Sequence, residues 1–113
     1  MEKCVVLTGA SRGLGLVLCR GFLEQGNRVY ALARSHSQEI QKLSQLYPGQ
    51  LTFLPCDVGS TESVEQAAER VKERESRVDV LVNNAGAHFH RGSQADFRET
   101  DFDDLRPTYE INA

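Results

Sequence analysis

The chain has 113 residues, about one small domain, and its 40% hydrophobic and 26% charged residues are ordinary for a globular protein. A formal net charge of −3 gives no indication of a basic surface for nucleic acid or an anionic membrane. No apolar run approaches the roughly 20 residues of a transmembrane helix, and the run at residues 4–7 is too short for a signal peptide. We therefore expect a cytoplasmic protein without nucleic-acid or membrane partners.

The cysteines and histidines do not form a recognisable metal site. Cys4, Cys19 and Cys56 are odd in number and far apart, which predicts buried thiols and neither a disulfide framework nor a zinc site. His88 and His90 form an H-x-H pair, but no Cys, Asp or Glu completes a plausible ligand set nearby. We expect no metal, and the pair belongs either to an exposed loop or to a loop that borders a substrate pocket.

The first half of the chain predicts strands alternating with helices. Residues 4–8 are apolar and β-branched before a glycine-rich turn, which is typical of a strand buried on both faces. Residues 13–25 follow as a helix, ended by Gly26-Asn27. Its apolar stripe is expected to contain Leu14, Val17, Leu18 and Phe22. Residues 28–33 predict a second strand, and residues 37–47 predict a helix that Pro48-Gly49 ends.

The pattern continues through two further strands. Residues 51–56 predict a third strand, whose Pro55 indicates an edge position or a strand end. Ser60 or Thr61 would cap the next helix, and residues 78–83 predict a fourth strand. This order predicts a single α/β domain, residues 1–113, with a Rossmann-like, doubly wound parallel sheet in the strand order third-second-first-fourth. Its ligand crevice would lie outside the carboxyl ends of the first and fourth strands.

The turn after the first strand contains three glycines, Gly9, Gly13 and Gly15, in the spacing G-x-x-x-G-x-G. Glycines here permit a tight turn, let the backbone approach a pyrophosphate, and let the helix pack close to the strand. Free amides and the helix dipole then face the anion. A plain turn that happens to be rich in glycine is the alternative.

Four motifs follow one another along the whole chain: the T-G-x-x-x-G-x-G turn at residues 8–15, an acidic residue after the third strand at Asp57, N-N-A-G at residues 83–86, and an asparagine, Asn112, in a helix after the fourth strand. Together these motifs resemble those of the short-chain dehydrogenase/reductase family. The resemblance implies an oxidoreductase that acts on a small carbonyl or alcohol substrate. It also implies a homo-oligomer for the intact family member.

The resemblance also implies roles for individual residues. Those expected to line the pyrophosphate and the adenosine ribose are Gly9, Ser11, Arg12 and Leu14. Asp57 would accept a hydrogen bond from the adenine amino group, with the Val58 backbone beside it. Those expected on the nicotinamide side are Asn83, Ala85 and Gly86, and Asn83 or Asn84 would also tie neighbouring strands together. Asn112 would be one of the four catalytic residues of the family and would hold a water that relays protons to the catalytic lysine.

The end of the second strand predicts NADP(H) in preference to NAD(H). An NAD enzyme usually has an acid about 20 residues beyond the glycines, but no acid lies between Gly26 and Gln38. Arg34 and Ser35 stand there instead, and Arg12 in the glycine turn offers a second guanidinium for a 2′-phosphate. The alternative is that both arginines are solvated surface residues.

The chain departs from the family pattern at its end. No Tyr-x-x-x-Lys pair occurs, so the C-terminal catalytic part is expected to be absent and the chain alone inactive. The fourth strand would be an unpaired apolar edge, and Pro107 would delay or kink the expected helix at residues 103–112. Besides part of an NADP-dependent oxidoreductase, a non-catalytic NADP-binding module and a non-functional remnant remain alternatives.

Overall fold

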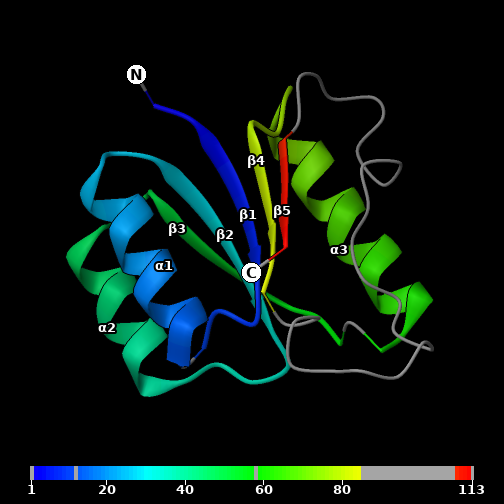
Figure 1. Cartoon of the computed structure of the whole chain (residues 1–113), viewed down its shortest axis with the longest axis horizontal. Coiled ribbons are helices and arrows are strands. Elements are labelled where there is room, and N and C mark those ends of the chain that lie inside the picture. Colours follow the sequence, from blue (N-terminus) through cyan, green and yellow to red (C-terminus); the bar gives the residue numbers. More distant parts are fainter. Residues whose placement is uncertain (1, 12, 58, 85–108, 113) are drawn as a thin grey trace.

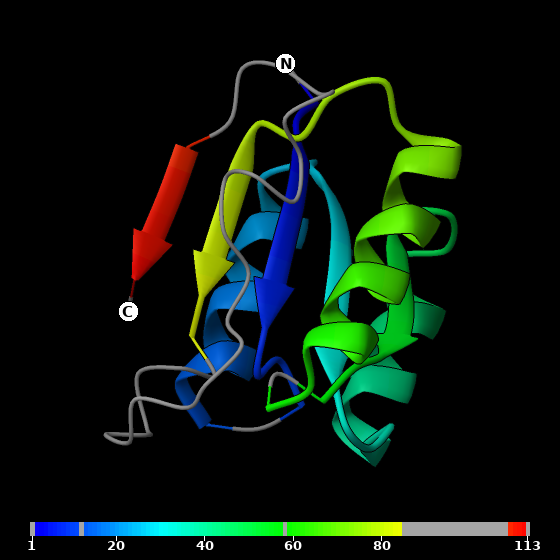
Figure 2. The same ribbon diagram turned by 90° about the vertical axis from the view of Figure 1, so that its right-hand side faces the viewer.

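The computed structural model describes residues 2–11, 13–57, 59–84 and, as backbone, 109–112. Along the chain these form β1 (Cys4–Thr8), α1 (Gly13–Glu24), β2 (Arg28–Ala33), α2 (Gln38–Leu46), β3 (Leu51–Pro55), α3 (Thr61–Arg74), β4 (Val80–Asn83) and β5 (Tyr109–Asn112). The strands form one parallel sheet in the order β3-β2-β1-β4-β5. Helices α1 and α2 cover one face of it and α3 covers the other (Figures 1 and 2). The predicted Rossmann-like architecture is confirmed, and so is the predicted order of its first four strands in the sheet.

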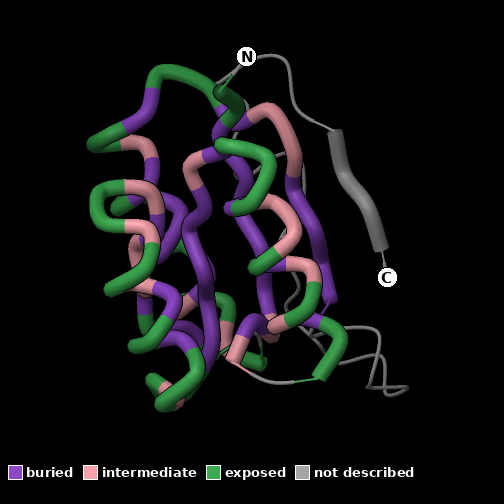
Figure 3. Tube along the Cα trace, turned by 90° about the vertical axis from the view of Figure 1, so that its left-hand side faces the viewer, coloured by how far each residue is buried: buried purple, intermediate pink, exposed green. Residues whose placement is uncertain are grey.

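The core lies on both faces of the sheet because alternate residues of each strand point to opposite sides. On β1, Val5 and Leu7 belong to the apolar cluster under α1 and α2, whereas Cys4 and Val6 belong to the cluster under α3. All four are fully buried, as predicted for a strand covered on both faces (Figure 3). The three cysteines are buried and form no disulfide, and burial raises the pKa of the Cys19 thiol to about 12.

Two serines begin the helices that follow β2 and β3. The Ser37 hydroxyl accepts a hydrogen bond from the Ile40 amide at 3.2 Å, and the Ser60 hydroxyl accepts one from the Ser63 amide at 3.2 Å. Each satisfies an amide that has no partner inside its helix. Ser60, not Thr61, is therefore the N-cap of α3. None of the helices in the described part of the chain is long and apolar enough to cross a membrane.

The rotation of α1 differs from the predicted stripe. Leu14 and Val17 are exposed, at 50% and 66%, while Gly15, Cys19 and Leu23 form the buried row at four-residue steps. Leu18 and Phe22 pack only at the edge of the core. The helix is apolar on more than one side over its first turns, so periodicity alone could not choose the buried face. The close approach of Gly15 to Gly9 in the glycine turn sets the buried face.

The expected helix at residues 103–112 is wrong for its last four residues. Tyr109–Asn112 forms strand β5, which pairs in parallel with β4 and sets Asn112 opposite Asn83. The predicted unpaired edge at β4 is wrong for the same reason. An apolar edge strand with unpaired amides and carbonyls favours pairing with an extended segment, and tyrosine and isoleucine suit a strand. The rest of that predicted helix, including Pro107, lies outside the described residues.

A charged cluster closes the end of the sheet at which β2 begins. The Glu75 carboxylate, which follows α3 and is 8% exposed, accepts hydrogen bonds from Arg28 Nε at 3.0 Å and from the Tyr30 hydroxyl at 2.7 Å. Burial alone would raise the pKa of Glu75, but the hydrogen bonds from Arg28 and Tyr30 and the Arg28 charge hold it below the usual value. Because the strands are parallel, this cluster lies at the opposite end of the sheet from the glycine turn.

Candidate functional site

The glycine turn lies at the carboxyl end of β1, where the chain passes into α1 (Figure 1). Gly9 and Gly13 adopt φ angles of 63° and 59°, a left-handed conformation that other residues rarely take. The Ala10 amide donates to the carbonyl of Leu32 at 3.3 Å, which ties the turn to the end of β2. The backbone of the turn is thus held in place, and two of its glycines are required by its shape.

Gly15 brings α1 against this turn. A Cβ atom at Gly15 would overlap the carbonyl oxygen of Gly9 and come within 2.7 Å of Asn84 Nδ2. The same Asn84 Nδ2 donates to the Gly9 carbonyl at 3.2 Å. Gly15 is therefore the glycine that permits close packing, and Asn84 joins the end of β4 to the turn. Sequence reasoning placed Asn84 only as a possible link between strands.

The end of β4 adds two buried amides to the same edge. Asn83 and Asn84 are each 2% exposed. The Thr8 hydroxyl donates to the Val82 carbonyl at 3.4 Å, which fastens β1 to β4 just before these residues. Among the residues that the structure describes, none donates to Asn84 Oδ1. A buried acceptor of this kind is normally satisfied by a ligand, water or another protein group.

The connection from β2 to α2 lies beside the glycine turn. Arg34 and Ser35 follow the last residue of β2 and are exposed. Ser37 donates through its hydroxyl to the carbonyl of Ser11 at 2.9 Å. The Ser37 contact was missed by sequence reasoning, which used this residue only as the start of a helix. The sequence showed that Ser37 could cap α2, but Ser11, whose carbonyl accepts the Ser37 hydroxyl, lies 26 residues away in the chain.

Asp57 lies at the carboxyl end of β3, the next strand of the same edge. Its Oδ1 accepts a hydrogen bond from the Gly59 amide at 2.9 Å, and its own amide donates to the Ser63 hydroxyl at 2.9 Å. The preceding residue, Cys56, donates through its amide to Ala33 at the end of β2. The carboxylate is exposed and held by its local turn, so it can still accept a hydrogen bond from a ligand.

The structure thus brings most of the predicted residues to one edge of the sheet. These are Gly9, Ser11, Gly13, Leu14, Gly15, Arg34, Ser35, Asp57, Asn83 and, on its backbone, Asn112. Four predicted cofactor residues, together with the H-x-H pair, lie outside the described part of the chain: Arg12, Val58, Ala85, Gly86, His88 and His90. Within the described ranges, no group of three His, Cys, Asp or Glu side chains could hold a metal.

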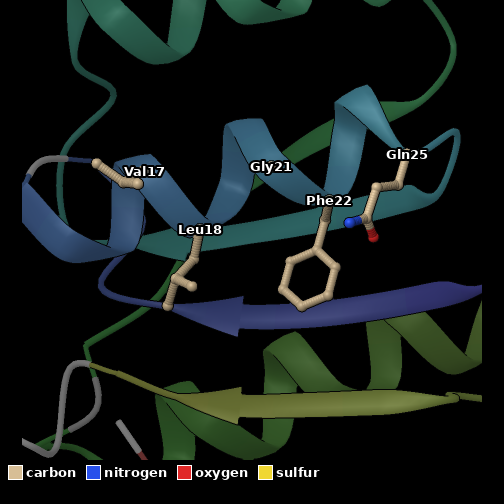
Figure 4. A pocket seen from close by; sticks show the side chains of 5 residues that line it. All are labelled: Val17, Leu18, Gly21, Phe22 and Gln25. Carbon is tan, nitrogen blue, oxygen red and sulfur yellow. The ribbon is translucent and has the colours of Figure 1, made fainter.

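A separate apolar depression of about 300 Å³ lies along α1 (Figure 4). Its lining residues are Val17, Leu18, Gly21, Phe22 and Gln25. Leu18 and Phe22 point from α1 toward β1. This lining offers one side-chain amide and no charged group, so it has no cationic partner for a phosphate.

The carboxyl edge of the sheet has the physical features of an anion site. The turn presents backbone at the start of a 12-residue helix that has no acidic residue in its first turn. Helix amides and the helix dipole favour a negative group there. The tight Gly15 packing leaves no side chain between that helix start and the strand. The arrangement fits the pyrophosphate of a dinucleotide laid across the edge.

Comparison with known proteins identifies relatives of the chain. Residues 3–113 match the short chain dehydrogenase family. The oxidoreductase UcpA of Salmonella typhimurium is 38% identical over 104 residues, which are 89% of this chain and 38% of that protein.

Two solved structures resemble the chain in fold and sequence. The Pseudomonas aeruginosa RhlG/NADP active-site complex is 36% identical, with a TM-score of 0.66 over 74% of this chain and 33% of that one. The alcohol dehydrogenase from the archaeon Thermococcus sibiricus, complexed with 5-hydroxy-NADP, is 37% identical, with a TM-score of 0.68 over 76% and 38%. The chain therefore spans less than two fifths of each of these relatives.

The sequence match and the structural likeness coincide on the same features. The match runs over almost the whole chain, and the sheet order places the glycine turn and the two asparagines at one edge. The chain belongs to the short chain dehydrogenase family of oxidoreductases.

Proposed function

We propose that residues 1–113 are the NADP(H)-binding part of an oxidoreductase that transfers a hydride between NADP(H) and a carbonyl or alcohol substrate. The observation that carries this proposal is the glycine turn, which the close packing of Gly15 and the hydrogen bond from Asn84 hold in place. Arg34 and Ser35 lie at the neighbouring end of β2. Two of the solved relatives carry NADP or 5-hydroxy-NADP, which supports the same cofactor class here.

The pyrophosphate would lie against the turn and the start of α1. Backbone amides there can donate to its oxygens without a side chain in the way. The residues that we assign to the pyrophosphate and the adenosine ribose are Gly9, Ser11, Arg12, Gly13, Leu14 and Gly15. Gly15 acts indirectly, because it lets α1 approach Gly9 and so sets the shape of the turn.

The 2′-phosphate would lie over the end of β2. A guanidinium binds phosphate oxygens in pairs, and a serine hydroxyl adds another donor. Arg34 and Ser35 are exposed at this place, and the sequence from Gly26 to Gln38 has no carboxylate that would repel the phosphate. We therefore assign the preference for NADP(H) to Arg34 and Ser35, assisted by Arg12.

The two rings of the cofactor would lie on either side of this phosphate region. For adenine we assign Asp57 and the Val58 backbone, and for the nicotinamide side Asn83, Ala85 and Gly86. Asn112 remains our candidate catalytic residue, now on a strand whose backbone lies opposite Asn83. When bound, NADP(H) supplies or accepts the hydride.

The chain by itself is expected to bind cofactor without turnover. The family's Tyr-x-x-x-Lys pair, which handles the proton, does not occur among the 113 residues. A binding module without catalysis is therefore the second candidate for this length of chain, and both candidates predict cofactor binding. A non-functional remnant predicts no stabilisation by NADPH.

A thermal-shift titration of the purified chain with NADPH and NADH tests the cofactor assignment. At 100 times its Kd, NADPH should stabilise the fold by about 2.7 kcal/mol. Replacing Arg34 with alanine should weaken NADPH binding about 10- to 100-fold and leave NADH binding nearly unchanged, because only NADPH has the 2′-phosphate. The matched control is Arg70→Ala, which removes an exposed guanidinium from α3. Equal or better stabilisation of the unaltered chain by NADH would refute the preference.

A further inference from the structure

The connection between β2 and α2 is anchored at both ends. On its β2 side, the Cys56 amide donates to the Ala33 carbonyl at 3.0 Å, and Ala33 pairs with Pro55 in the sheet. On its α2 side, residues His36 and Ser37 make two further contacts. Only Arg34 and Ser35 lie between these anchors.

The two anchors on the α2 side reach in different directions. The His36 ring stacks on Phe53 of β3, with centroids 4.5 Å apart and planes 8° from parallel. The Ser37 hydroxyl reaches the opposite neighbour and donates to the Ser11 carbonyl in the glycine turn at 2.9 Å. The same hydroxyl accepts the Ile40 amide at 3.2 Å. One contact holds the connection to the edge of the sheet, and the other holds it to the phosphate turn.

We propose that His36 and Ser37 are positioning residues that set the discrimination between NADP(H) and NAD(H). This inference rests on the proposed function, in which Arg34 and Ser35 receive the 2′-phosphate. With Ala33 fixed on one side and His36 and Ser37 on the other, the two-residue bridge keeps few conformations. Its donors are then ordered before the phosphate arrives, and less ordering is required on binding.

The geometry assigns different tasks to neighbouring residues. His36 lies flat on Phe53, so its ring acts through the position of the backbone it carries. Ser37 links the glycine turn, which would hold the pyrophosphate, to the β2–α2 connection, which would hold the 2′-phosphate. Loss of either anchor should therefore weaken binding of the cofactor that has a 2′-phosphate more than binding of the one that lacks it.

The test measures the Kd values of NADPH and NADH for the unaltered chain, four variants at His36 and Ser37, and one control variant. His36→Ala removes the stack, and His36→Phe keeps a flat ring without the imidazole. Ser37→Ala removes the hydroxyl, and Ser37→Thr retains a hydroxyl for both hydrogen bonds. Gln38→Ala, at the exposed first residue of α2, is the matched control.

His36→Ala and Ser37→Ala should each weaken NADPH binding about 2- to 10-fold with NADH nearly unchanged. His36→Phe and Ser37→Thr should restore the ratio of the two Kd values, which a loss of general stability would not explain. If the unaltered chain binds NADH as tightly as NADPH, the proposed cofactor preference fails and this inference fails with it.

If the unaltered chain prefers NADPH but both alanine variants keep the same ratio of the two Kd values, the positioning role is overturned and the proposed function stands. Equal weakening of NADPH and NADH binding overturns the positioning role as well. Should Ser37→Ala fail to fold because α2 loses its cap, His36→Ala and His36→Phe still decide the outcome, because His36 is exposed.

Discussion

A methyl group added at Gly15 would overlap the Gly9 carbonyl and crowd Asn84 Nδ2, in a helix where alanine is otherwise the better residue. Gly15→Ala must therefore push α1 away from the turn or break the hydrogen bond from Asn84. We expect the free energy of unfolding to fall by about 3 kcal/mol or more. A loss of about 3 kcal/mol is the upper end of the usual cost of overpacking a core. Urea denaturation followed by circular dichroism measures it.

Gly21→Ala provides the matched control for this prediction. Gly21 lies in the same helix, and a Cβ there would meet nothing within 4 Å. The substitution should stabilise the chain by up to about 1 kcal/mol, because alanine is the stronger helix former. Equal effects of the two substitutions would show that Gly15 does not hold α1 against the turn.

At the scale of single elements, the start of α3 distinguishes two adjacent residues that the sequence left as alternatives. Ser60 caps the helix with its hydroxyl, whereas Thr61 is the first helical residue and is exposed. Ser60→Ala should cost about 1 kcal/mol of unfolding free energy, because the Ser63 amide loses its acceptor. Thr61→Ala should change it by less than about 0.5 kcal/mol. Thermal unfolding of both variants checks the assignment, and a larger effect at Thr61 would reverse it.

The elements that sequence could predict are those whose evidence is local. The strands β1 to β3 show as short apolar runs, and the helices α2 and α3 show as apolar rows behind a serine. The rotation of α1 and the pairing of β5 depend on contacts made far away in the sequence. For α1 the deciding contact is Gly15 with Gly9, and for β5 it is the register of β4.

At the scale of the whole molecule, the same division holds for the candidate site. The glycine spacing, Arg34 and Asp57 were visible in the sequence, because parallel strands bring their carboxyl ends to one edge. The hydrogen bond from Asn84 to Gly9 joins residues 75 positions apart, and no local sequence pattern predicts it. The contacts that shape the site are thus the least predictable part of it.

The opposite end of the sheet predicts how the stability of the whole chain depends on pH. Glu75 is buried and accepts hydrogen bonds from Arg28 and Tyr30, and its pKa in the folded chain lies below the usual value of about 4.3. A depressed pKa in the folded state means that the ionised carboxylate stabilises the fold above the unfolded pKa. This contribution is lost as the pH falls from about 4.3 through the folded pKa.

Glu75→Gln should therefore lower the free energy of unfolding by about 2 kcal/mol at pH 7, the usual worth of hydrogen bonds to a charged group. The difference between the two proteins should shrink steadily below about pH 4.3, where the unfolded glutamate takes up its proton. Glu69→Gln is the matched control, because the Glu69 side chain is 69% exposed and its pair with Lys72 lies on the surface. Urea unfolding at a series of pH values gives each difference directly. A Glu75→Gln difference that stayed constant down to pH 2 would contradict the role of this carboxylate, since Asp79 and the other acids are unchanged in both proteins and their contributions cancel.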